Sequence, residues 1–302
     1  MNIVIIGSQG FIGSHLCKYF IAKAHNVYGA DILETPVNIN YTYTKLSRLS
    51  TEWETILSNN KMDVCINAAG SGNVAYSVAH PLIDFEANTL DVIKILDAIR
   101  KHQPTCKYVH ISSAAVYGNP TSLPIQETAA LSPISPYGYH KMMSEIICKE
   151  YQYLFGLNIS IVRPFSVFGN GLRKQLLWDI CTKLLKDDNI TLFGTGNETR
   201  DFIHISDLVL LIDLIIEKSN FGASIFNVAS GNETYIKSIA SIFENYFANT
   251  KKINFSGETK KGDPLNWKAD VSKLAALGFT PTANFENELI NYANWFKALS
   301  AK

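Results

Sequence analysis

The sequence predicts an α/β fold: a doubly wound parallel sheet followed by a smaller C-terminal α+β lobe. Short, mostly apolar strands alternate with helical segments at least four times in the first part of the chain, which is the pattern of parallel strands joined by crossover helices. The first strand also runs directly into a turn that contains Gly7, Gly10 and Gly13, and apolar residues at helical spacing follow it. This order of strand, glycine turn and helix is typical of the start of such a sheet.

Five runs are expected as strands of the sheet and two as long helices beside it. Each strand is a short, largely apolar stretch bounded by polar residues or glycine. The second helix begins after Ser135, a good N-cap, with Pro136 at its first position. The strands are expected at 3–6, 26–30, 62–67, 108–112 and 159–162, and the helices at 83–101 and 136–155.

Beyond Gly169 strands and helices follow one another less regularly. We therefore expect two domains, 1–168 and 169–302, with elements near 204–229 returning to the first. The second domain is expected to contain helices at 176–186, 208–217, 236–247 and 289–296, and strands at 190–193 and 225–228.

The composition argues against several classes of partner. The 27 acidic and 27 basic residues leave no net charge to attract nucleic acid or an anionic membrane. No run approaches the roughly 18 apolar residues of a membrane span, and the first apolar run is too short for a signal peptide. The five cysteines lack metal-ligand spacing, so we expect reduced thiols, a cytoplasmic protein and no metal site. They are Cys17, Cys65, Cys106, Cys148 and Cys181.

The glycine turn has the features of a dinucleotide site. Gly7 would form the turn, Gly10 would admit phosphates to the helix N-terminus, and Gly13 would let helix and strand pack closely. Asp31 follows the second strand, about 20 residues beyond the glycines, where a carboxylate takes the ribose hydroxyls. Because this carboxylate would repel a 2′-phosphate, we expect NAD(H) rather than NADP(H) as the cofactor. Small residues at 68–70 end the third strand and suit a ligand that lies against the backbone.

Three further residues are candidates for acid–base chemistry. Tyr137 and Lys141 lie one turn apart on the same face of the predicted helix. A free phenol has a pKa near 10, which an adjacent ammonium and the positive ring of an oxidised nicotinamide would lower. Such a tyrosine can take or give a hydroxyl proton while a hydride moves. Ser113, at the end of a central strand, would orient the substrate oxygen by a hydrogen bond.

Seven motifs, in order along nearly the whole chain, resemble the extended short-chain dehydrogenase/reductase family, and within it the nucleotide-sugar epimerases and ketoreductases. Together they are specific for the family and much less so for the substrate. They are GSQGFIG at 7–13, NAAG at 67–70, SSAAVYG at 112–118, YGYHK at 137–141, RPF at 163–165, TRDFIH at 199–204 and GDP at 262–264.

The resemblance implies an NAD-binding Rossmann domain at 1–168 and a lobe at 169–302 that binds a nucleotide-diphosphate sugar. It also implies a homodimer formed through the helices at 83–101 and 136–155, whose apolar surface exceeds what one sheet face can cover. The implied catalytic residues are Ser113, Tyr137 and Lys141. The implied cofactor-binding residues are Gly7, Gly10, Phe11, Ile12, Gly13, Asp31, Ala68, Ala69, Gly70, Asn88, Tyr137, Lys141 and Pro164, and the implied substrate-binding residues are Ser113, Tyr137, Ser166, Arg200, Lys260 and Asp263.

Departures from the family pattern indicate which of the family's reactions to expect. The Asp-Glu pair that follows the serine or threonine position in the family's dehydratases is Ala114-Ala115 here, so we expect no dehydration. Ser166 replaces a common asparagine, and Lys260-Lys261 stands where an arginine commonly precedes Gly-Asp. The segment 41–50 lacks the aspartate that members of the family usually carry after their third strand, so we expect adenine recognition to differ from theirs.

Three functions remain open from the sequence: a 4-epimerase, an NAD(P)H-dependent 4-ketoreductase of a 4-keto-6-deoxy nucleotide sugar, and a non-catalytic dinucleotide-binding sensor. The intact Ser113, Tyr137 and Lys141 argue against the sensor. Tightly held, co-purifying NAD would favour the epimerase over the reductase. Two residues have alternative interpretations: Arg200 could form a surface ion pair with Asp201, and His204 is expected to be structural.

Overall fold

The centre of the protein is a seven-stranded sheet in which every pairing is parallel. The computed structural model describes all residues except 35–38, 48–51, 249, 259–261 and 301–302. The strand order is β10-β6-β5-β4-β1-β2-β3, so the chain starts near the middle and winds outward to both edges. The predicted doubly wound parallel sheet is therefore confirmed. Its strands are β1 (Asn2–Ile6), β2 (Asn26–Asp31), β3 (Thr42–Lys45), β4 (Val64–Asn67), β5 (Lys107–Ile111), β6 (Asn158–Pro164) and β10 (Gly222–Val228).

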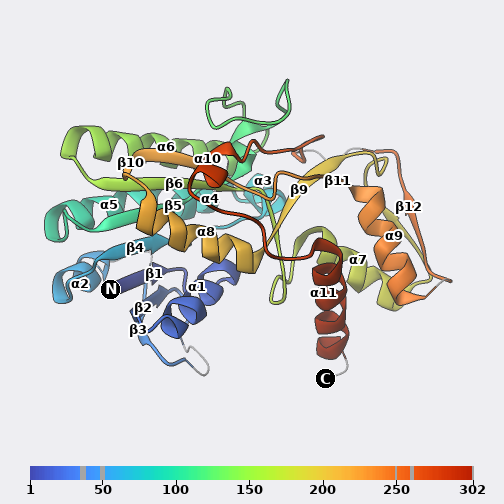
Figure 1. The fold of residues 1–302 in the computed structure, drawn as a ribbon, viewed down its shortest axis with the longest axis horizontal. Coiled ribbons are helices and arrows are strands. Elements are labelled where there is room, and N and C mark those ends of the chain that lie inside the picture. The colour runs from blue at the N-terminus through green and yellow to red at the C-terminus, as the bar shows by residue number, and fades with distance from the viewer. Residues whose placement is uncertain (35–38, 48–51, 249, 259–261, 301–302) are drawn as a thin grey trace.

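Helices cover both faces of the sheet (Figure 1). Ile3 and Ile5 of β1 pack into one apolar core, and Val4 and Ile6 pack into the other, because successive side chains of a strand point to opposite faces. The first core includes side chains of α1 (Phe11–Ala22) and α8 (Ile205–Lys218). The second includes side chains of α2 (Glu52–Asn59), α5 (Asp91–His102) and α6 (Pro136–Phe155).

The helix expected at 83–101 is interrupted, which corrects the prediction. It consists of α4 (Pro81–Phe85), a π-helical segment (Glu86–Leu90) and α5, and it follows α3 (Val74–Ala79). A π-helical turn adds residues without breaking the apolar pattern, so hydrophobic spacing does not reveal it. The short polar strand β3 at the sheet edge was not expected from the sequence either.

The C-terminal lobe lies beside the sheet domain and carries its own apolar core (Figure 1). It contains a three-stranded sheet, β11-β9-β7, and a two-stranded sheet, β12-β8. Its helices are α7 (Gln175–Lys186), α9 (Ile236–Phe247) and α11 (Phe285–Ser300), and its strands are β7 (Ser166–Phe168), β8 (Asn189–Leu192), β9 (Thr199–His204), β11 (Glu233–Tyr235) and β12 (Lys252–Phe255). The short helix α10 (Ser272–Ala276) instead packs against β10 of the sheet domain (Figure 1).

All five cysteines are buried and none forms a disulfide. Among the described residues, no helix has the length and apolar character needed to cross a bilayer. Within the same residues, no group of three His, Cys, Asp or Glu side chains is arranged to hold a metal ion.

A buried ion pair connects α6 to β6. The Arg163 guanidinium donates two hydrogen bonds to the Glu145 carboxylate, Nε to Oε1 at 2.8 Å and Nη2 to Oε2 at 2.6 Å. Arg163 is 1% exposed and Glu145 is fully buried. The Ser112 hydroxyl donates to the same carboxylate at 2.6 Å, and Arg163 Nη1 donates to the Tyr117 hydroxyl at 2.7 Å. The pair therefore fixes α6 against the ends of β5 and β6.

Replacing one partner of this pair should destabilise the fold. Arg163→Met leaves the Glu145 carboxylate buried without its counter-charge, so we expect the free energy of unfolding to fall by about 3–5 kcal/mol. The double variant Arg163→Met/Glu145→Met removes both charges and should recover part of that loss. Denaturant unfolding followed by tryptophan fluorescence measures both. An Arg163→Met protein as stable as wild type would contradict the prediction.

Candidate active site

The glycine turn between β1 and α1 is packed so closely that two of its positions exclude side chains. A Cβ on Gly13 would lie 2.0 Å from the Gly7 carbonyl oxygen, and one on Gly7 would lie 2.7 Å from the Ala69 nitrogen. Gly7 also has a φ of +81°, and its N–H donates to the Ala30 carbonyl at 2.7 Å. Gly10 is the N-cap of α1, and no side chain caps that helix end. Its backbone N–H groups are therefore free to bind an anion.

Asp31, at the end of β2, lies directly beside this turn. Its carboxylate accepts hydrogen bonds from the Gln9 N–H at 2.8 Å and the Ile32 N–H at 2.7 Å, one on each oxygen. Each oxygen keeps a further lone pair for a ribose hydroxyl. The Gln9 side chain donates to the Tyr41 hydroxyl at 2.6 Å, and the Tyr41 ring packs against Gly29. Tyr41 precedes β3, and no local pattern in the sequence indicates its position here.

Gly70, Asn88 and Lys141 meet at the end of β4. A Cβ on Gly70 would lie 2.3 Å from Asn88 Oδ1 and 3.4 Å from Lys141 Nζ. Asn88 lies in the π-helical segment and is fully buried. Its Nδ2 donates to the Ser71 carbonyl at 3.3 Å, whereas its Oδ1 is buried without a hydrogen-bond partner. An unpaired buried acceptor is costly, so this atom is suited to a donor group of a bound ligand.

Ser113, Tyr137 and Lys141 come together at the same edge of the sheet. Lys141 is 4% exposed, and its Nζ donates to the Ile111 carbonyl of β5 at 2.9 Å. Desolvation lowers the pKa of Lys141 to about 8. Desolvation raises the pKa of Tyr137 to about 12, and a hydrogen bond with the Ser113 side chain opposes this rise. Ser113 Oγ also accepts the Ala115 N–H at 3.1 Å, which starts a 3₁₀ turn (Ala114–Tyr117).

A chain of buried polar groups supports the backbone beneath this cluster. Asn67 Oδ1 accepts the Ala69 N–H at 3.1 Å, and its Nδ2 donates to the Tyr108 hydroxyl at 2.9 Å. The Tyr108 hydroxyl lies 3.4 Å from His110 Nδ1. His110 Nε2 lies 2.8 Å from Ser144 Oγ, and that hydroxyl donates to the Lys141 carbonyl at 2.7 Å. Burial lowers the pKa of His110 well below its usual value, so the imidazole is neutral. The apolar spacing of β5 predicts a strand but does not reveal this chain.

Arg200 projects from β9 in the C-terminal lobe. Its Nη1 donates to the carbonyls of Thr199 and Leu265 at 2.8 and 3.1 Å, and its guanidinium lies 5.8 Å from the centre of the Trp267 ring. Burial lowers the pKa of Arg200, and the exposed Asp263 opposes this shift by its charge. Arg200 makes no ion pair with its neighbour Asp201.

Asp201 instead has a structural role. It is fully buried and accepts hydrogen bonds from the N–H groups of Ser230 at 2.9 Å and Ala269 at 3.0 Å.

The remaining predicted site residues lie at the ends of strands or outside the described part of the chain. Ser166 begins β7, which pairs with β9 so that Ser166 lies opposite Phe202. Pro164 ends β6 and is buried. Lys260 lies outside the described residues.

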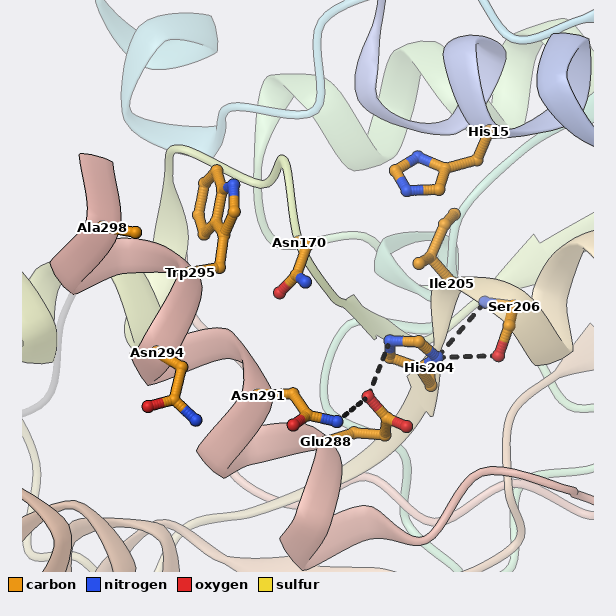
Figure 2. A pocket seen from close by; sticks show the side chains of 10 residues that line it. All are labelled: His15, Asn170, His204, Ile205, Ser206, Glu288, Asn291, Asn294, Trp295 and Ala298. Carbon is orange, nitrogen blue, oxygen red and sulfur yellow. Dashed lines mark hydrogen bonds and ion pairs between the residues drawn. The ribbon is translucent and has the colours of Figure 1, made fainter.

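His204 lies in a different place, a hollow of about 530 Å3 between α1 and α11 (Figure 2). Its Nδ1 lies 2.7 Å from the Ser206 hydroxyl, and its Nε2 lies 3.6 Å from a Glu288 oxygen. His15 and Trp295 line the same hollow. None of the predicted site residues lies there.

Comparisons with known proteins identify the family. The family described as "NAD dependent epimerase/dehydratase family" matches residues 3–229. The chain belongs to this family. It is therefore an enzyme of the extended short-chain dehydrogenase type, and NAD is its cofactor. The glycine cradle, the free N-terminus of α1 and the unpaired Asn88 Oδ1 fit that cofactor.

Similar proteins carry epimerase names. A putative UDP-glucose 4-epimerase of Methanocaldococcus jannaschii is 28% identical over 98% of both chains, and an uncharacterized UDP-glucose epimerase of Bacillus subtilis is 29% identical over 99% of both. A UDP-glucuronic acid 4-epimerase from Bacillus cereus, solved with UDP-glucuronic acid and NAD, has a TM-score of 0.90 and 27% identity over 99% of this chain and 100% of that one. A UDP-glucose 4-epimerase from Thermotoga maritima, solved with UDP-glucose, has a TM-score of 0.91 and 25% identity over the same shares.

The buried Lys141 should make stability depend on pH. In cofactor-free protein its pKa is about 8, below its ordinary value of 10.5. Between these values the native state has lost the proton that the unfolded chain keeps, so raising the pH stabilises the fold. We expect the difference in unfolding free energy between wild type and Lys141→Met to rise by up to about 1.4 kcal/mol per pH unit from pH 8 to 10.

Denaturant unfolding at several pH values measures this difference. Lys149→Met removes an exposed ammonium from the same helix and serves as the matched control. A wild-type curve parallel to that of Lys141→Met over the whole range would contradict the prediction.

Proposed function

We propose that this protein is an NAD-dependent nucleotide-sugar 4-epimerase that oxidises the sugar transiently at C4 and returns the hydride to the opposite face. The proposal rests on one observation: Ser113, Tyr137 and Lys141 lie together at the edge of the sheet that also carries the glycine turn. Several proteins named as epimerases match this chain over nearly their whole length, which supports the proposal. The alanines at 114 and 115 support epimerisation over dehydration.

Each catalytic residue has a distinct task in this proposal. Tyr137 takes the proton of the C4 hydroxyl and returns it, and Ser113 holds the same oxygen by a hydrogen bond. At neutral pH the Lys141 ammonium, fixed by the Ile111 carbonyl, is charged. Together with the positive ring of a bound oxidised nicotinamide, it would lower the pKa of the phenol from about 12 in the cofactor-free protein toward the working range. When bound, NAD supplies a reversible hydride acceptor. Asn88 and Lys141 would hold the nicotinamide end, and Asp31 the adenosine ribose.

We place the boundary between the NAD-binding domain and the substrate-binding lobe between residues 168 and 169. The substrate would lie between these two parts. In the second lobe Arg200 carries a planar guanidinium suited to phosphate oxygens. Its stacking on Trp267 and its bonds to two carbonyls hold its position. Ser166, Lys260 and Asp263 complete the proposed substrate contacts.

Turnover should depend on the phenol of Tyr137. We expect Tyr137→Phe to lower the rate of epimerisation by about 100- to 10,000-fold, because the C4 proton then has no acceptor. A panel of UDP-, dTDP-, GDP- and CDP-sugars, followed by NMR, identifies the substrate and measures the loss. Tyr235→Phe removes an exposed hydroxyl away from Tyr137 and from the proposed dimer surface and is the control.

Two results would contradict the proposal. Unchanged turnover in Tyr137→Phe would remove Tyr137 from the mechanism. An enzyme that purifies without NAD and oxidises added NADH or NADPH with a 4-keto sugar would be a ketoreductase.

We also propose that the protein is a homodimer. The helices at 81–102 and 136–155 expose several large apolar side chains on one side of the sheet domain, and α4 packs against α6. Single exposed apolar residues are common, but a set on adjacent helices marks an association surface. The set comprises Leu82, Ile83, Leu90, Tyr139, Met143, Ile146, Tyr153 and Leu154.

A charge within this surface should split the dimer. We expect sedimentation at micromolar concentration to give twice the 33.6 kDa chain mass for wild type and the chain mass for Ile146→Glu. Leu185→Glu places the same charge on an exposed position of α7 and should leave the dimer intact. A monomeric wild type would contradict the proposal.

A further inference from the structure

Lys174 ends the loop that leads from β7 to α7, and this loop runs along the candidate active site. At the near end of the loop, a Cβ on Gly171 would lie 3.5 Å from the His15 ring and 3.6 Å from the Phe11 ring of α1. At the far end, a Cβ on Gly72 would lie 3.5 Å from Lys174 Nζ and 3.8 Å from the Tyr137 hydroxyl. The Lys174 ammonium and the Tyr137 phenol therefore approach the same point of the loop after β4.

Among the residues that the structure describes, none carries a charge that pairs with Lys174. Desolvation lowers its pKa, and no carboxylate among the described residues offsets that shift. No hydrogen bond or ion pair to a described residue holds its Nζ either. The neighbouring Arg173 points elsewhere, into a hollow that Trp178 and Phe296 also line. The Lys174 side chain is exposed, so its ammonium is open to a ligand. A cation beside Tyr137 that no nearby carboxylate of a described residue neutralises attracts an anionic group.

We propose that Lys174 binds an oxyanion of the substrate, next to the sugar carbon that Tyr137 acts on. This inference rests on the proposed function, because the Tyr137 hydroxyl then marks the C4 oxygen of a hexose. Two kinds of oxyanion can lie within the width of one sugar ring from that oxygen in a nucleotide sugar. One is a C6 carboxylate in a hexuronic acid, and the other is the phosphate on C1. Both accept a hydrogen bond from an ammonium, and a neutral hydroxyl would not balance its charge.

Calorimetric binding to Lys174→Met tests the proposal without turnover. The probes are the nucleoside diphosphate that wild type binds, found from UDP, dTDP, GDP and CDP, together with its glucose and glucuronic acid derivatives. We expect Lys174→Met to bind at least one probe about 10- to 100-fold more weakly, as for loss of a charged hydrogen bond. Lys174→Arg keeps the charge and should stay within a few-fold of wild type. Arg173→Met, which loses a cation one residue away, should bind as wild type does.

The pattern of loss identifies the oxyanion. Equal loss for all three probes assigns Lys174 to the phosphate, and loss for the glucuronic acid derivative alone assigns it to the carboxylate. Unchanged affinity for all three probes, or a loss confined to NAD, would overturn the proposal and leave the epimerase function intact. A wild-type protein that binds none of the nucleoside diphosphates would overturn the proposed function as well.

Discussion

The buried Arg163–Glu145 pair fixes the relative positions of the candidate catalytic residues. Glu145 lies on α6, one turn beyond Lys141, so its two bonds to Arg163 of β6 hold the helix that carries the candidate base and its ammonium. The same carboxylate accepts the hydroxyl of Ser112, the residue before Ser113. Arg163 also donates to Tyr117, whose hydroxyl bonds to Asn227 of β10 at 2.6 Å. Removing either charge would therefore disturb the geometry of the site as well as the stability of the fold.

Charges in this protein are compensated where they hold the fold and uncompensated where a ligand is expected. Arg163 and Asp201 are buried, and each has its hydrogen bonds satisfied by the protein. Lys141 is also buried, but its ammonium has only one carbonyl partner. The Asn88 carbonyl and the Lys174 ammonium have none among the described residues. Other buried polar atoms also lack a hydrogen-bond partner within the described part of the chain; they include Trp53 Nε1, Thr182 Oγ1 and Asp213 Oδ1. Only the unpaired groups near Tyr137 are therefore assigned to the proposed ligands.

Local patterns predicted most of the sheet domain and indicated the residues that the structure brings together at the candidate site. The glycine spacing, the carboxylate at Asp31 and the start of α6 after Ser135 are signals confined to a few adjacent residues, and the structure has the helix at 136–155 where it was expected. The π-helical segment at Asn88, the position of Lys174 and the chain through His110 depend on contacts between segments far apart in sequence. Such contacts leave no periodic pattern, so the sequence alone did not reveal them.

The packing around the 3₁₀ turn after Ser113 bears on the type of reaction. Ala114 is fully buried in an apolar cluster with Tyr117, Phe165 and Trp267. A carboxylate at position 114 would have to enter this cluster without a counter-charge, at a large cost in free energy. Beside it, a Cβ on Gly138 would lie 2.6 Å from the Ala115 carbonyl, so α6 and the backbone of the turn are in close contact. The buried apolar position of Ala114 therefore supports the proposed epimerisation, with Tyr137 as the proposed proton-transferring group, over dehydration.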